Sequence, residues 1–141
     1  MKKSLLIALA ILLVFSCKKQ KLDPEGPTDV RIKNLTTFTL KDVTINLDDE
    51  VVNFGEIGKQ DTSKYHRFKK THPLIKVSAT VETADGKKIY KTEDNIDYTY
   101  QQYMGQMRVT YEIYVKSGTA IETKVITDEP LILDEEYYDL F

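Results

Sequence analysis

The fold is decided most clearly by MRVTYEIYVK, residues 107–116, where apolar and polar side chains alternate one for one. Successive side chains of a β-strand point to opposite faces of the sheet, so this stretch predicts a strand with one buried and one solvated face. A Ser117-Gly118 pair follows it, and a second alternating stretch runs over residues 119–127. A turn at the Ser-Gly pair would join the two stretches as a β-hairpin.

The same period of two recurs earlier in the chain. Its apolar positions are Val30, Ile32, Phe38, Leu40, Val43, Ile45, Leu47, Ile75, Val77, Ala79 and Val81. An Asp85-Gly86 pair between two such stretches is a strong hairpin signal. With seven or eight strands and no amphipathic helix, the sequence predicts an all-β domain. We expect an antiparallel sandwich of two sheets, which resembles immunoglobulin-like or fibronectin-like domains.

Composition and charge exclude several classes of protein. The 141 residues include 20 Lys and Arg against 22 Asp and Glu, so the basic excess of a dedicated nucleic-acid-binding protein is missing. The chain has one cysteine, which rules out an intrachain disulfide and a multi-cysteine zinc site. We therefore expect no nucleic-acid partner.

The amino-terminal residues have the pattern of a secretory leader. Lys2 and Lys3 precede an unbroken apolar run over residues 5–15, and Ser16-Cys17 follows it. A helix needs roughly 20 apolar residues to cross a bilayer, so the run is too short to span one, but it fits the apolar core of a signal peptide.

Val14-Phe15-Ser16-Cys17 resembles the lipobox of bacterial lipoproteins, and the Ser-Cys-Lys-Lys run is similar to that of small Bacteroidota lipoproteins. The resemblance implies cleavage after Ser16, a lipid on the Cys17 sulfur and an acylated amino terminus. Fatty acyl chains would then hold the protein on a membrane. It also implies a cell-envelope location, with the outer membrane favoured. The alternative is an ordinary signal peptide cut nearby, which would leave Cys17 as an unmodified thiol.

These patterns divide the chain into four parts. Residues 1–16 are a signal peptide, and residues 17–29 are a polar, proline-containing tether behind the lipid. Residues 30–127 form the β domain, and residues 128–141 form an acidic, aromatic tail.

The segment FGEIGKQDTSKYHRF, residues 54–68, resembles one found in small Bacteroidota lipoproteins, where a glycine-containing bend precedes a Ser-x-Tyr-x-x-Phe strand. Tyr65 and Phe68 are three residues apart, so a regular strand sends them to opposite faces. We therefore expect a bulge, or one of the two aromatic rings packed outside the core.

No arrangement of residues in the sequence predicts catalysis. The motifs of serine hydrolases, zinc proteases and phosphate-binding loops do not occur. His66 and His72 lie on a polar stretch, where we expect surface positions and no shared metal. Acidic pairs such as Glu93-Asp94 stand in turn-like contexts. We predict a protein that is not an enzyme and that holds neither a cofactor nor a metal ion.

Tyrosines mark the candidate partner surface. They occur in two groups, Tyr98, Tyr100 and Tyr103 in one and Tyr137 and Tyr138 in the other. Tyrosine offers a rigid ring with a polar tip, which suits protein and glycan partners alike, although tyrosines at the rim of a core would look the same. The leading hypothesis is a lipid-anchored, non-enzymatic binding or structural module. The alternative is an accessory subunit or inhibitor whose acidic tail engages a basic protein.

Overall fold

The computed structural model describes residues 22–47, 50–99 and 101–133. These ranges contain eight strands and no helix. The strands are β1 (Thr28–Asn34), β2 (Leu40–Leu47), β3 (Glu50–Ile57), β4 (His66–Phe68), β5 (Lys76–Thr83), β6 (Gly86–Lys91), β7 (Met107–Ser117) and β8 (Ala120–Pro130). The all-β prediction with about eight strands is confirmed. Within the described ranges, no helix has the length and apolarity needed to cross a membrane.

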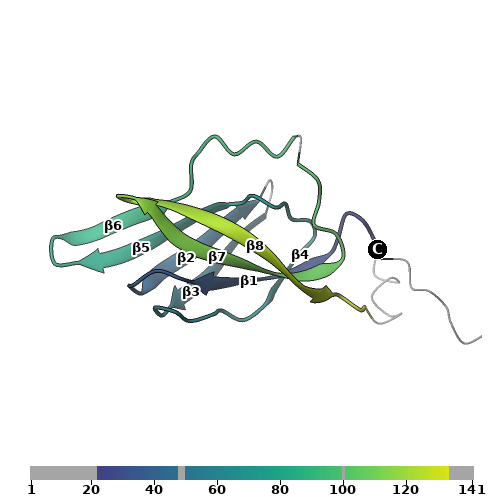
Figure 1. Cartoon of the computed structure of the whole chain (residues 1–141), viewed down its shortest axis with the longest axis horizontal. Coiled ribbons are helices and arrows are strands. Elements are labelled where there is room, and N and C mark those ends of the chain that lie inside the picture. The colour runs from purple at the N-terminus through teal and green to yellow at the C-terminus, as the bar shows by residue number, and fades with distance from the viewer. Residues whose placement is uncertain (1–21, 48–49, 100, 134–141) are drawn as a thin grey trace, which may run out of the picture.

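The eight strands follow one another in a single hydrogen-bonded sheet, in the order β3-β2-β5-β6-β8-β7-β1-β4. The sheet curls until its two edges approach, so that the rings of Phe54 on β3 and Phe68 on β4 lie 6.4 Å apart. Its weakest seam is between β6 and β8, which share one residue pair, Lys91 with Ala120. Figure 1 shows the curled sheet and the long loop from β6 to β7 that arches over it.

The expectation of a purely antiparallel arrangement was wrong. The sheet is mixed, because β1 runs parallel to β7 from the Thr28–Met107 pair to the Asn34–Ile113 pair, and β6 runs parallel to β8. It is also continuous. The physical reason is that alternation fixes which side chains face the core, whereas it carries no information about which strand lies alongside or in which direction.

The two hairpin predictions are confirmed. The β5–β6 hairpin closes at the Thr83–Gly86 pair, and the β7–β8 hairpin closes at Ser117 and Ala120. Gly118 has a φ of 54°, in the left-handed region that a side chain disfavours. Glycine at this position therefore allows the tight turn.

The core lies inside the curled sheet and is built from the apolar positions of the alternating stretches. Its fully buried members are Val30, Ile32, Leu40, Val43, Ile45, Phe68, Ile75, Val109, Tyr111 and Ile113. The Tyr65 and Phe68 prediction is also confirmed, because Phe68 is buried whereas Tyr65 is exposed outside the core. The interior is thus closed by aromatic and β-branched side chains, which suit a pleated surface.

Candidate functional site

The structure describes two of the residues predicted for the partner surface. Tyr98 and Tyr103 lie in the loop between β6 and β7. The other three, Tyr100, Tyr137 and Tyr138, lie outside the described residues, and so does Cys17, the predicted lipidation site. The site is therefore built around Tyr98 and Tyr103.

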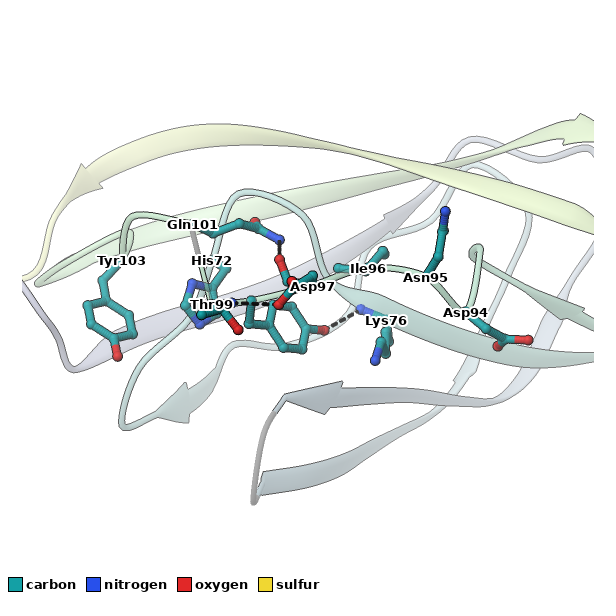
Figure 2. Close-up of a pocket in the computed structure, with 10 residues that line it drawn as sticks. His72, Lys76, Asp94, Asn95, Ile96, Asp97, Thr99, Gln101 and Tyr103 are labelled. Atoms are coloured by element: carbon teal, nitrogen blue, oxygen red, sulfur yellow. Dashed lines mark hydrogen bonds between the residues drawn. The ribbon is translucent and has the colours of Figure 1, made fainter.

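Both tyrosines line a cavity of about 630 Å³, which we call the tyrosine cavity. It lies between the β6–β7 loop and the segment that leads into β5. Its walls are His72, Lys76, Asp94, Asn95, Ile96, Asp97, Tyr98, Thr99, Gln101 and Tyr103. Figure 2 shows Tyr103 and His72 at one end and Asp94 at the other, with Asp97 and Lys76 between them.

Three aromatic rings stack at one end of the cavity. The imidazole of His72 lies 4.9 Å from the Tyr98 ring at 15° and 4.9 Å from the Tyr103 ring at 35°. The Lys76 ammonium is 5.5 Å from the Tyr98 ring centroid, and the Lys70 ammonium is 4.8 Å from that of Tyr103. Such stacked and cation–π contacts each hold the rings in place. Tyr103 is the member that keeps 39% of its surface exposed.

His72 was expected at the surface, and that prediction was wrong. Its exposed fraction is 3%, and the rings of both tyrosines pack against its own ring. His66 does lie exposed on β4. The sequence around His72 is polar and gives no sign of burial. The burial comes from the β6–β7 loop folding back over it, which a local pattern does not encode.

The segment that carries His72 is fixed from below by the core. The hydroxyl of the buried Tyr111 donates to the backbone carbonyl of His72 and accepts from the Thr71 hydroxyl at 3.0 Å. Burial raises the pKa of Tyr111 above its ordinary value, so the phenol remains a neutral donor at any physiological pH. A residue at the centre of β7 thus positions the floor of the cavity.

The loop itself is fixed to its neighbours by side chains. The Tyr98 hydroxyl donates to the Asn46 carbonyl at 3.0 Å and accepts from the Lys76 backbone N–H at 2.8 Å. The Gln101 side-chain oxygen accepts from the Leu74 N–H at 3.1 Å. The backbone of Met104 donates to the Thr71 carbonyl at 2.8 Å. The cavity is therefore preformed, which lowers the entropic cost of binding a ligand there.

Carboxylates form the polar side of the cavity. Asp97 accepts from the Thr99 backbone N–H at 2.9 Å, and this hydrogen bond lowers the pKa of Asp97. Asp94 pairs with the Lys91 ammonium at 2.5 Å. The carboxylate oxygens of Asp94 and Asp97 are hydrogen-bond acceptors. Within the described residues, no three His, Cys, Asp or Glu side chains gather as a metal ion would require.

Sequence reasoning found the tyrosines but missed the polar half of the cavity. The sequence pattern predicts an ordinary turn context for Asp94, and it does not single out Lys76 as a site residue. The available signal was that Asp94 and Asp97 both lie within a few residues of Tyr98 on one loop. The contribution of Lys76 and His72 comes from a different segment and depends on tertiary contacts.

A second polar region covers the outer face of β1, β7 and β8 and the segment 65–67. We call it the charged ladder. It consists of Asp29, Arg31, Tyr65, Arg67, Arg108, Thr110, Asp128 and Glu129. Arg67 holds the mostly buried Asp29 with two hydrogen bonds, at 2.7 and 3.0 Å. Asp128 accepts from the Tyr65 hydroxyl and from the Thr110 hydroxyl, each at 2.7 Å. The polar groups of the charged ladder therefore bind one another.

Comparison with known proteins adds little to this geometry. No family model matches the chain, and no curated protein matches it. A solved structure, described as the NMR structure of the protein from Eubacterium rectale, is similar to 74% of this chain and 94% of its own, with 18% sequence identity and a TM-score of 0.37.

Proposed function

We propose that the protein is a lipid-anchored lipoprotein of the cell envelope whose β domain is a non-enzymatic binding module, with its ligand in the tyrosine cavity. The observation that carries the binding part is the preformed cavity, in which His72, Tyr98 and Tyr103 stack beside the carboxylates of Asp94 and Asp97. Cavities of a few hundred Å³ with aromatic walls and a few placed polar groups are the usual form of a small-ligand site.

The anchoring part of the proposal rests on Cys17 and on the lipobox-like residues before it. Two or three acyl chains would hold the domain on a membrane permanently, because each buried methylene contributes about 0.8 kcal/mol. The polar residues between Cys17 and β1 would then tether the domain near that membrane, with the outer membrane as the favoured location.

An immunoglobulin-like or fibronectin-like arrangement of the β domain belongs to the same proposal. The single residue pair that joins β6 to β8 divides the sheet into two four-stranded halves with the core between them. That division supports an arrangement like a sandwich. Domains of this architecture serve many unrelated functions, so the functional argument rests on the cavity.

The anchor is tested by expressing the full chain with its leader in a bacterium that processes lipoproteins. The wild type is expected in the membrane fraction, with an acylated Cys17 as the first residue by mass spectrometry. Cys17→Ser is expected in the soluble fraction, and Ser16→Gly, which keeps a small residue before the cysteine, is expected to behave as wild type. A wild type that keeps an unmodified thiol and fractionates with Cys17→Ser would contradict anchoring.

Binding is tested with three classes of probe: an oligosaccharide panel, a random-peptide display library and phospholipid vesicles. Wild type is compared with Tyr103→Ala at the cavity and with Tyr65→Ala on the charged ladder. Binding of any one class that Tyr103→Ala abolishes and Tyr65→Ala preserves supports the binding module. The absence of Tyr103-dependent binding in all three classes would overturn it.

A further inference from the structure

We infer that the tyrosine cavity takes an uncharged, hydroxyl-rich ligand, a short segment of a neutral saccharide. This inference rests on the proposed binding function and specifies its ligand class. The cavity, at about 630 Å³, is large enough for an organic ligand and far larger than an ion needs. Its lining residues extend along the loop from Tyr103 to Asp94, so the site suits an extended ligand more than a compact one (Figure 2).

The charge around the cavity is balanced. Lys76 lines it beside Asp97, Lys91 pairs with Asp94, and Lys70, over the Tyr103 ring, pairs with Glu25, so three cations accompany three carboxylates. A ligand that carries phosphate, sulfate or a carboxylate needs an excess of Lys or Arg at its site, since removing an anion from water is costly without it. The balance therefore favours a ligand without net charge.

The hydrogen-bonding groups match neighbouring hydroxyls. The Asp97 carboxylate accepts from the Thr99 backbone N–H and retains further acceptor capacity, and Asp94 adds a second carboxylate. The ammonium of Lys76 donates, and the Asn95 side chain does both. A hydroxyl both donates and accepts, so adjacent hydroxyls on a sugar can use acceptors and donors of the cavity together.

The aromatic end supplies the apolar contact that a sugar ring also needs. His72 fixes one side of the Tyr103 ring, and 39% of Tyr103 stays exposed. A rigid ring with a polar tip binds at low entropic cost. It suits a partner that carries an apolar face next to polar groups. The Tyr98 ring also stacks on His72 and helps to hold the imidazole in place.

Two other ligand classes fit less well. A lipid or other apolar ligand needs a largely apolar cavity, whereas this one is lined by two acids, two amides and a lysine. A peptide that adds as a β-strand needs main-chain groups that are still available. Here the main-chain groups of Asn46, Leu74 and Lys76 already bond to Tyr98 and Gln101.

The test uses the full chain in detergent and a panel of neutral gluco-, manno-, galacto- and xylo-oligosaccharides, with polygalacturonate fragments and heparin fragments as acidic probes. Isothermal titration calorimetry gives the affinities, and NMR locates the site through amide shifts. We expect at least one neutral oligosaccharide to bind and to shift amides of residues 94–99 but not those of β3. Tyr103→Ala and Asp94→Ala should each weaken binding by about tenfold or more.

Asp94→Ala keeps the test valid if Tyr103→Ala disturbs the fold, because Asp94 is highly exposed and its loss is structurally mild. Glu122→Ala, on β8, is the matched control and should bind as wild type. The inference is overturned if no neutral oligosaccharide binds, if the acidic fragments alone bind, or if both cavity variants bind normally. Tyr103-dependent binding of a displayed peptide without saccharide binding would overturn the ligand class and leave the proposed binding module standing.

Discussion

Tyr65 and Tyr103 are exposed to nearly the same extent, 36% and 39%, each has a cation over its ring and each lines a cavity, yet the hydrogen bonding around them differs. Tyr65 donates its hydroxyl to Asp128 and is part of the charged ladder, where polar groups bind one another. Tyr103 stands at the end of a cavity whose acids retain acceptor capacity. Exposure alone therefore does not separate the two tyrosines, and the proposal that Tyr103 binds a ligand rests on the hydrogen bonding of its surroundings.

The same contrast extends to what supports each region. The charged ladder is held by its own side chains, across β1, β7 and β8. The tyrosine cavity is held from beneath, by the buried hydroxyl of Tyr111 under His72, and from the sides by Tyr98 and Gln101. A substitution in the ladder should thus affect stability, and one at the mouth of the cavity should affect binding.

The largest effect should come from Tyr111→Phe, which breaks the support beneath the cavity. The change leaves the His72 carbonyl and the Thr71 hydroxyl without their buried partner, which costs roughly 1–3 kcal/mol of unfolding free energy. Urea denaturation measures the loss. Binding should weaken as well, because the floor of the cavity is no longer fixed. An unchanged midpoint and unchanged affinity would show that Tyr111 does not position the cavity.

A smaller loss of stability should follow from Arg67→Ala in the charged ladder. Asp29 then loses two hydrogen bonds while it remains mostly buried, and Arg108, at 3.7 Å, compensates in part. We expect about 1–2 kcal/mol by urea denaturation, with binding at the cavity preserved. If Arg67→Ala binds more weakly under conditions in which it is fully folded, the charged ladder and the tyrosine cavity are coupled.

Replacing each exposed tyrosine by alanine sharpens the comparison directly. Tyr65→Ala removes a hydrogen bond to a carboxylate, so it should lower stability by about 1 kcal/mol, which corresponds to roughly 4 °C in Tm. Tyr103→Ala should lower stability less and binding far more. Differential scanning calorimetry and titration on both variants check the two halves of this statement. Equal effects on stability and binding in the two variants would remove the distinction.

The smallest effect is a change in acid sensitivity. Burial alone raises the pKa of Asp128, but hydrogen bonds from Tyr65 and Thr110 and the charge on Arg31 outweigh it and lower the pKa. A lowered folded-state pKa contributes stability above the unfolded value of about 3.9, and that contribution is lost as the pH falls through the folded value. Asp128→Asn should therefore show a shallower loss of Tm below about pH 4 than the wild type. If Tm falls equally steeply with decreasing pH in Asp128→Asn and in the wild type, this assignment is contradicted.

How far the sequence predicts this molecule depends on whether a feature is local. The alternation of residues 107–116 and the Asp85-Gly86 turn predict strands and hairpins, because each signal lies within the segment it describes. The three-residue spacing of Tyr65 and Phe68 predicts one ring inside and one outside for the same reason. Such local signals do not predict strand order, because β1 pairs with β7 across about 80 residues of chain.

The candidate site also contains features that are local in sequence and features that are not. Tyr98 and Tyr103 could be proposed from sequence, because aromatic residues gather in one short stretch. The burial of His72 and the role of Lys76 could not, since each depends on a loop that returns from more than 20 residues further along the chain. The balance of charge at the cavity is likewise a tertiary property.

The most direct test is one thermal-shift experiment with wild type, Tyr65→Ala and Tyr103→Ala, each with and without a saturating neutral oligosaccharide. A ligand that binds the folded state raises Tm. We predict that the ligand raises Tm for wild type and for Tyr65→Ala, although the latter starts from a lower value, and that it leaves Tm of Tyr103→Ala unchanged. A ligand-induced shift that survives in Tyr103→Ala and disappears in Tyr65→Ala would contradict the account.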